Sequence, residues 1–132
     1  MRYIIVLGSN CGLREKAVKE AIDFIASFCK VDFETPVYES PDCLGTGHRY
    51  MNAVAAITSS LDLEALILRF KRYEEESGRT LRSRALGLVP IDIDVVASED
   101  EILRPSDFNS SYFKEGYALL PSELKLLKNP IC

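Results

Sequence analysis

The sequence is poor in residues that bind transition metals. It holds one histidine, His48, and four cysteines, none of them in a C-x-x-C pair. We therefore expect no zinc site, and we interpret the cysteines as small buried hydrophobes with free thiols. His48, in a glycine-containing loop beside Arg49, is interpreted as an exposed loop residue and not as a catalytic base.

Common nucleotide-binding and nucleophile motifs are also missing. The chain has no G-x-x-x-x-G-K-[ST] segment and no G-x-G-x-x-G segment, which argues against a P-loop or Rossmann enzyme. It has no G-x-S-x-G segment either, so a Ser-His-Asp triad is not supported. Phosphate chemistry, if present, must use other groups.

Long apolar runs and an excess of positive charge are absent as well. No run is long enough for a signal peptide or a membrane span. A net charge of −4 and a pI near 5.1 argue against general nucleic-acid binding. The length of 132 residues with 47% hydrophobic residues suits one domain covering residues 1–132. We predict a cytoplasmic monomer that binds neither nucleic acid nor membrane.

Hydrophobic periodicity predicts alternating strands and helices. Spacings of three and four residues indicate helices, and β-rich apolar runs indicate strands. The order β-α-β-β-α-β predicts a ferredoxin-like α+β fold, with two helices on one face of an antiparallel sheet. The other face is expected to be open to a ligand, and a C-terminal extension beyond residue 98 is expected to lie over the sheet. The predicted segments are strands at 2–7, 50–58 and 90–96, helices at 13–29 and 62–77, an extended piece at 30–38, and loops at 39–47 and 79–89.

The strand PIDIDVV, residues 90–96, carries two aspartates in an otherwise apolar run. Side chains alternate along a strand, so Asp92 and Asp94 share one face while Ile91 and Ile93 share the other. Two neighbouring carboxylates in a half-buried place repel each other unless a cation is near. A pair of this kind suits Mg²⁺, which binds one or two carboxylates together with substrate phosphates. The alternative is the outward polar side of an amphipathic strand.

A loop with three arginines precedes this strand. The segment GRTLRSR holds Arg79, Arg82 and Arg84, whose guanidinium groups match phosphate oxygens. The alternative is a solvated loop that pairs with the acidic run at residues 74–76. That run ends a predicted helix, where the macrodipole disfavours negative charge. Nearby arginines or a metal would relieve this repulsion at Glu74 and its neighbours.

Tyr50 and Asn52 lie two residues apart and so share a face of their strand. An aromatic ring to stack and an amide to donate and accept hydrogen bonds suit a planar heterocycle. Tyr117 is a candidate for a second aromatic. The alternative is ordinary packing and an edge hydrogen bond.

Taken together, several segments resemble the 6-hydroxymethyl-7,8-dihydropterin pyrophosphokinase family. The motifs occur in order over nearly the whole chain: LGSN at 7–10, VYESPDCLG at 37–45, YMNAVA at 50–55, EEESGR at 74–79, PIDIDVV at 90–96, PSDF at 105–108 and EGYALLP at 115–121. The resemblance implies a ferredoxin-like fold and transfer of pyrophosphate from ATP to the pterin hydroxymethyl group. It also implies two Mg²⁺ ions and a place in folate synthesis.

The resemblance assigns expected roles to individual residues. Asp92 and Asp94 match the family's magnesium ligands, while Arg79 and Glu74 match an arginine and an acidic residue of the nucleotide site. The pterin-binding residues are expected to be Ser40, Pro41, Leu44, Tyr50, Asn52 and Tyr117.

The chain departs from the family around the phosphates. Where the family typically reads R-W-G-P-R-T-L-D-L-D, residues 85–94 read A-L-G-L-V-P-I-D-I-D, so Leu86 replaces a tryptophan and Val89 an arginine. Leu81 stands at a further arginine position, and Ser106 at a histidine position. Arg82 and Arg84 are candidates to compensate as catalytic arginines, because their side chains are long. Two hypotheses therefore stand: a pyrophosphokinase, or a catalytically impaired pterin- or nucleotide-binding paralogue.

Overall fold

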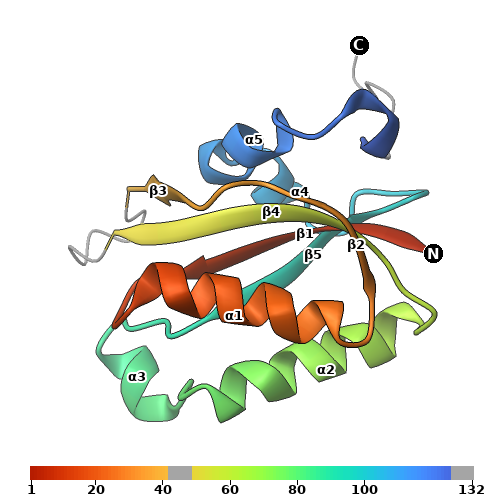
Figure 1. The fold of residues 1–132 in the computed structure, drawn as a ribbon. Coiled ribbons are helices and arrows are strands. Elements are labelled where there is room, and N and C mark those ends of the chain that lie inside the picture. Colours follow the sequence, from red (N-terminus) through yellow and green to blue (C-terminus); the bar gives the residue numbers. More distant parts are fainter. Residues whose placement is uncertain (42–48, 126–132) are drawn as a thin grey trace.

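The computed structural model describes residues 1–41 and 49–125. Its centre is an antiparallel sheet with the strand order β2-β4-β1-β5, in which β3 also pairs with β4 (Figure 1). This order and the helix placement confirm the predicted ferredoxin-like α+β fold. The strands are β1 (Arg2–Ser9), β2 (Lys30–Glu34), β3 (Tyr38–Ser40), β4 (Tyr50–Thr58) and β5 (Asp92–Ser98).

Two long helices, α1 (Arg14–Ala26) and α2 (Leu63–Glu76), cover one face of the sheet. The side chain of Asp62 caps α2 by accepting a hydrogen bond from the backbone N–H of Ala65 at 2.8 Å. Gly78, with φ of +105°, follows the end of α2 in a left-handed conformation that glycine tolerates. The main core lies between these helices and the sheet, and it includes Leu7, Val18, Ile25, Leu66, Phe70, Ile91 and Ile93.

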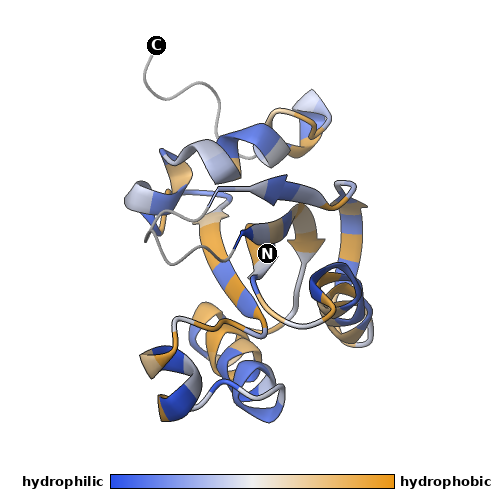
Figure 2. Ribbon diagram, turned by 90° about the vertical axis from the view of Figure 1, so that its left-hand side faces the viewer, coloured by the Kyte–Doolittle hydropathy of each residue, from blue (hydrophilic) through white to orange (hydrophobic). Residues whose placement is uncertain are grey.

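The C-terminal extension packs on the opposite face. It contains α4 (Pro105–Phe108), α5 (Ser111–Tyr117) and a 3-10 helix, η1 (Ser122–Leu124). In Figure 2 the sheet lies between this extension, above, and the α1 and α2 layer, below. A second apolar cluster of Ile4, Val6, Val54, Ala56, Val96, Ala97, Phe113 and Leu120 joins the extension to the sheet. This confirms the expectation that the extension lies over the sheet, and it leaves only part of the second face open to a ligand.

Two predicted loops are partly regular structure. Residues 39–40 belong to β3, while residues 42–47 of that loop, including Leu44, lie outside the described residues. The segment 79–89 contains a short helix, α3 (Leu81–Ala85). Its start is a capping box, in which Thr80 and Ser83 each accept a hydrogen bond from the other's backbone N–H, at 3.1 and 2.8 Å. This local pairing stabilises a helix that is too short to show apolar periodicity.

Among the described residues, none of the helices has the length and apolar character needed to cross a membrane.

The contact between α5 and β4 depends on Gly116. A Cβ atom added there would lie closer than 3.0 Å to the Val54 side chain and the Tyr38 hydroxyl. We expect Gly116→Ala to lower the free energy of unfolding by about 1–3 kcal/mol, because the extension would have to shift away from the sheet. Urea denaturation of this variant beside Lys114→Ala, an exposed change in the same helix, measures the effect. Equal stability of the two variants would contradict this packing.

Candidate active site on the open part of the sheet

A cavity opens on the extension side of the sheet, at the end of β1. Gly8 pairs with Asp92 of β5 and with Asn52 of β4, so these three residues form one row across the sheet. A Cβ atom on Gly8 would lie 3.1 Å from Oδ1 of Asn52, so glycine at this position keeps the floor of the cavity open. The cavity, of about 150 Å³, is lined by Val6, Leu7, Gly8, Ser40, Pro41, Tyr50, Asn52, Asp92, Asp94 and Tyr112.

One end of the cavity is suited to a polar ring. Asn52 is buried, and its Nδ2 donates to Oγ of Ser40 at 2.7 Å. Ser40 is also the register partner of Tyr50, so β3 and β4 hold the three side chains close together. Tyr112 lines the same cavity from the extension. An oriented amide in a cavity that is also lined by aromatic residues can bind a flat heterocycle by stacking and hydrogen bonds.

The other end of the cavity carries the two aspartates. Ile91, Ile93 and Val95 are buried in the main core, while Asp92 and Asp94 point to the cavity, as strand alternation predicts. Asp94 is 9% exposed. The two carboxylates therefore share a small, largely desolvated space.

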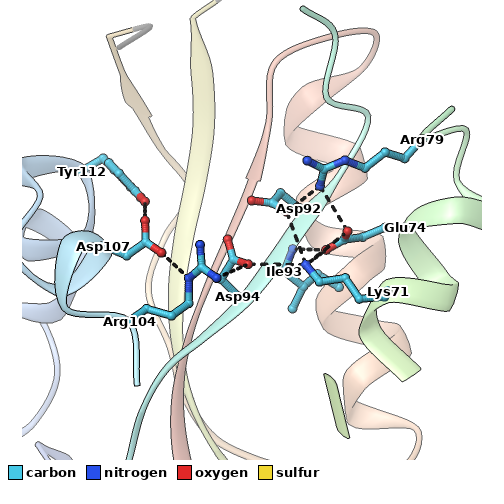
Figure 3. Close-up of polar contacts among 9 residues, drawn as sticks. All are labelled: Lys71, Glu74, Arg79, Asp92, Ile93, Asp94, Arg104, Asp107 and Tyr112. Carbon is cyan, nitrogen blue, oxygen red and sulfur yellow. Dashed lines mark hydrogen bonds and ion pairs between the residues drawn. The ribbon is translucent and has the colours of Figure 1, made fainter. Parts of the chain in front are cut away.

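Three cations from different segments surround these carboxylates (Figure 3). Arg79 donates to Oδ1 of Asp92 at 2.6 Å. Lys71 of α2 lies 3.5 Å from Oδ1 of Asp94 and 3.9 Å from Oδ1 of Asp92. Arg104, just before α4, places Nη1 3.9 Å from Oδ1 of Asp94. The negative charge of the strand is thus balanced from two sides of the molecule.

Glu74 is a third carboxylate and is only 3% exposed. Its Oε2 accepts a hydrogen bond from the backbone N–H of Ile93 at 2.8 Å, and its Oε1 accepts one from Arg79 at 3.1 Å. Lys71 lies 3.2 Å from its Oε2. The predicted relief of a carboxylate at a helix C-terminus is present, because Arg79 and Lys71 both contact Glu74.

Their surroundings shift the pKa values of the two aspartates in opposite directions. Burial, with a hydrogen bond and repulsion from Asp92, raises the pKa of Asp94 to about 7. Burial also opposes ionisation of Asp92, but hydrogen bonds from Asp94 and Arg79 and the Arg79 charge outweigh it, so the pKa of Asp92 is lowered. A cation bound between the two carboxylates would lower the pKa of Asp94 and favour the ionised form of both.

The donor set fits a magnesium ion that also has non-protein ligands. Within residues 1–41 and 49–125, no group of three or more His, Cys, Asp or Glu side chains is arranged to hold a metal. Two carboxylates are enough for Mg²⁺, which takes its other ligands from water and substrate phosphates. Asp92 and Asp94 are the side chains that fit this role.

The structure brings only some of the predicted site residues together. Ser40, Pro41, Tyr50, Asn52, Asp92 and Asp94 line one cavity, with Glu74 and Arg79 beside it. Tyr117 does not line it and instead packs on Phe108 and Phe113, with ring centroids 5.5 and 5.4 Å away. Arg82 and Arg84 lie exposed on α3. Leu44 lies outside the described residues.

Sequence reasoning missed Lys71, Arg104 and Tyr112. Lys71 had a usable signal, because it lies three residues before Glu74 and so on the same face of α2. Arg104 and Tyr112 had none, because the folding of the extension alone brings them to the site.

Asn10 joins the segment after α3 to the end of β1. Its Nδ2 donates to the carbonyl of Gly87 at 2.9 Å, and its Oδ1 accepts from the backbone N–H of Val89 at 2.6 Å. The backbone N–H of Asn10 donates to the carbonyl of Val89 at 3.0 Å. Three hydrogen bonds thus fix the chain that leads from α3 into the aspartate strand.

A family model and a known relative that match this chain carry the name of the same enzyme. Residues 4–124 match the family model of 7,8-dihydro-6-hydroxymethylpterin-pyrophosphokinase. The 2-amino-4-hydroxy-6-hydroxymethyldihydropteridine pyrophosphokinase of Aquifex aeolicus (strain VF5) is 33% identical over 99 residues, which are 74% of this chain and 61% of that protein. The chain thus spans about three fifths of the length of this relative. A solved ACT domain protein from Streptococcus pneumoniae is 15% identical, with a TM-score of 0.37 and coverage of 74% of this chain and 91% of that one, a likeness too weak to inform on function.

The raised pKa of Asp94 predicts a pH dependence of stability. Between its ordinary pKa of 3.8 and about 7, this group holds a proton in the folded state and not in the unfolded state. The free energy of unfolding of metal-free protein should therefore fall as the pH rises from 5 to 8. We expect Asp94→Asn to weaken this fall and to raise stability at pH 8, measured by urea denaturation with a chelator.

Asp100→Asn, a change at an exposed aspartate after β5, is the matched control and should keep the wild-type slope. The same slope in Asp94→Asn as in wild type would contradict the assigned environment of Asp94.

The hydrogen bonds of Asn10 give a second prediction. We expect Asn10→Ala to lower the free energy of unfolding by about 1–3 kcal/mol and to speed amide exchange at Val89, because the side-chain acceptor for its N–H is lost. Hydrogen exchange followed by NMR measures this, with Asn109→Ala, at an exposed position, as control. Unchanged protection at Val89 would show that Asn10 does not fix this segment.

Proposed function

Because the chain belongs to the 7,8-dihydro-6-hydroxymethylpterin-pyrophosphokinase family, we propose that it transfers pyrophosphate from ATP to the hydroxymethyl group of 6-hydroxymethyl-7,8-dihydropterin in folate biosynthesis. The observation that carries this proposal is one cavity with ring-binding side chains at one end and two carboxylates at the other. A pterin bound at the first end would direct its hydroxymethyl group toward phosphates held at the second.

In this proposal the pterin ring contacts Tyr50 and Asn52, with Ser40 orienting the amide of Asn52. Pro41 lines the same cavity, and Leu44, which lies outside the described residues, stays a proposed pterin contact from the family resemblance. Tyr112 is better placed than Tyr117 for the second aromatic contact, because it lines the cavity. Tyr117 then supports α5 from within the extension.

Asp92 and Asp94 would hold the Mg²⁺ ions that accompany ATP, two in the family. Bound Mg²⁺ supplies neutralisation of the phosphate charge and fixes the orientation of the phosphates. Arg79 would stabilise charge that develops on the phosphates, since its Nε is a buried donor with no hydrogen-bond partner. Glu74 acts through Arg79, which it holds by an ion pair of 3.1 Å.

The proposed reaction is attack of the pterin hydroxyl oxygen on the β-phosphorus of ATP. A new P–O bond forms, the bond from the β-phosphorus to the oxygen bridging it to the α-phosphorus breaks, AMP leaves, and the hydroxyl proton passes to solvent. The residues named above bind and orient the reactants and balance charge, which are the main contributions to catalysis of phosphoryl transfer.

A second candidate function is pterin or nucleotide binding without turnover. Arg82 and Arg84, the candidates to replace the missing phosphate-handling groups, lie exposed on α3, and Leu81 beside them is 84% exposed. Loss of one charged contact in such a site costs about 10²–10³ in rate, so two losses would leave only residual activity.

AMP formation distinguishes the two functions. Purified protein with 6-hydroxymethyl-7,8-dihydropterin and magnesium ATP should release AMP only when the pterin is present. Asp92→Asn combined with Asp94→Asn should reduce the rate at least about 10³-fold, because both metal ligands are lost. Asp100→Asn should keep the wild-type rate. Pterin binding without AMP above the level of the double variant would favour the binding paralogue.

A further inference from the structure

The cations around the aspartates are not those that the arginine-rich segment predicted. Arg79 is the only arginine of GRTLRSR for which the structure gives a contact with the carboxylates. The other two positive charges come from Lys71 in α2 and Arg104 before α4. Because these two residues come from separate parts of the chain, positive charge beside the carboxylates is a feature of the folded site and not of one basic segment.

Lys71 and Arg104 approach the same atom from opposite sides. Lys71 Nζ lies 3.5 Å and Arg104 Nη1 3.9 Å from Oδ1 of Asp94 (Figure 3). Both side chains are about half exposed, at 44% and 51%, whereas Arg79 is 21% exposed. The two cations are half exposed and their contacts with the buried Asp94 are long, so both side chains have room to turn to another anion.

Arg104 is held in place by a chain of polar contacts. Its Nε donates to Oδ2 of Asp107, and Oδ1 of Asp107 accepts a hydrogen bond from the hydroxyl of Tyr112. Tyr112 itself lines the cavity, and its carbonyl accepts from the Tyr38 hydroxyl at 2.6 Å. The guanidinium is therefore directed at the carboxylate end of the cavity and keeps donors free of Asp107.

Charge balance indicates what these two cations bind. The cations Lys71, Arg79 and Arg104 face Glu74, Asp92 and Asp94, and Arg104 is also paired with Asp107, so the cluster has three cations and four carboxylates. A carboxylate that coordinates Mg²⁺ is a poor partner for a neighbouring ammonium or guanidinium group, because its charge is already neutralised. Lys71 then keeps Glu74 as a partner and Arg104 keeps Asp107, but each cation still has further N–H donors, and phosphate oxygens are suitable acceptors for them.

We propose that Lys71 and Arg104 bind the terminal phosphate groups of the nucleotide, beyond the α-phosphate, taking the part that the sequence assigned to Arg82 and Arg84. This inference rests on the proposed binding of ATP at the site. Asp107 and Tyr112 are positioning residues for Arg104, while Lys71 reaches the phosphates from the α2 side of β5.

The test is a comparison of nucleotides that differ in phosphate number. Calorimetric titration with AMP, ADP and ATP in the presence of Mg²⁺ is made on wild type, Lys71→Met and Arg104→Met. We expect each variant to bind ATP about tenfold or more weakly, while binding of AMP changes less than about threefold, because each lost contact is a charged hydrogen bond to a terminal phosphate. Lys71→Arg and Arg104→Lys should recover part of the ATP affinity.

Arg72→Met is the matched control. Arg72 is exposed and directly follows Lys71 in α2. The Arg72→Met protein should bind all three nucleotides with wild-type affinity. Circular dichroism and pterin affinity check that each variant keeps the fold and the ring end of the cavity. Lys71→Gln and Arg104→Gln serve if a methionine variant fails to fold.

The outcomes separate this inference from the proposed function. Wild-type AMP release together with unchanged ATP affinity in both variants would overturn the role of Lys71 and Arg104 and leave the pyrophosphokinase intact. Equal weakening of AMP and ATP would also overturn it, since the effect would then be structural. If the wild type releases no AMP, but both variants bind ATP more weakly and AMP as before, the inference is supported and the proposed enzyme activity is contradicted. A wild type that binds no nucleotide would overturn both.

Discussion

The electrostatic cost of placing Asp92 and Asp94 side by side governs the arrangement of this site. One face of β5 supplies apolar side chains to the main core, so the strand cannot turn its aspartates outward without losing Ile93 and Val95 from that core. The carboxylates must therefore face a largely desolvated space. Lys71 from α2 and Arg104 from the extension gather around them, so the same charges that make the site also connect the two helical layers across β5.

Alternation and spacing predicted the parts of the protein that depend on local sequence. The faces of β5, the end of α2 at Gly78 and the neighbouring positions of Tyr50 and Asn52 follow from the periods of strand and helix, and the structure agrees. The order of elements predicted the ferredoxin-like sheet for the same reason. Such features need no knowledge of contacts between distant segments.

The sequence could not indicate features that depend on distant packing. Arg82 and Arg84 are near the aspartates in sequence, yet the capping box at Thr80 winds their segment into α3 and leaves both exposed. Arg104 enters the site because the chain returns along β5 after Ser98. Tyr117 lies in an aromatic group within the extension.

The hydrogen bond from Ile93 to Glu74 also affects how the sheet can associate with other chains. β5 is an edge strand, and an edge strand offers unpaired N–H and C=O groups to any extended chain. Glu74 occupies the N–H of Ile93, and farther along the carbonyl of Val96 accepts hydrogen bonds from the backbone of Leu103 and Arg104. A second copy could extend the sheet along β5 only by displacing these groups. The contacts that organise the acidic cavity thereby protect this edge of the fold against strand-to-strand aggregation.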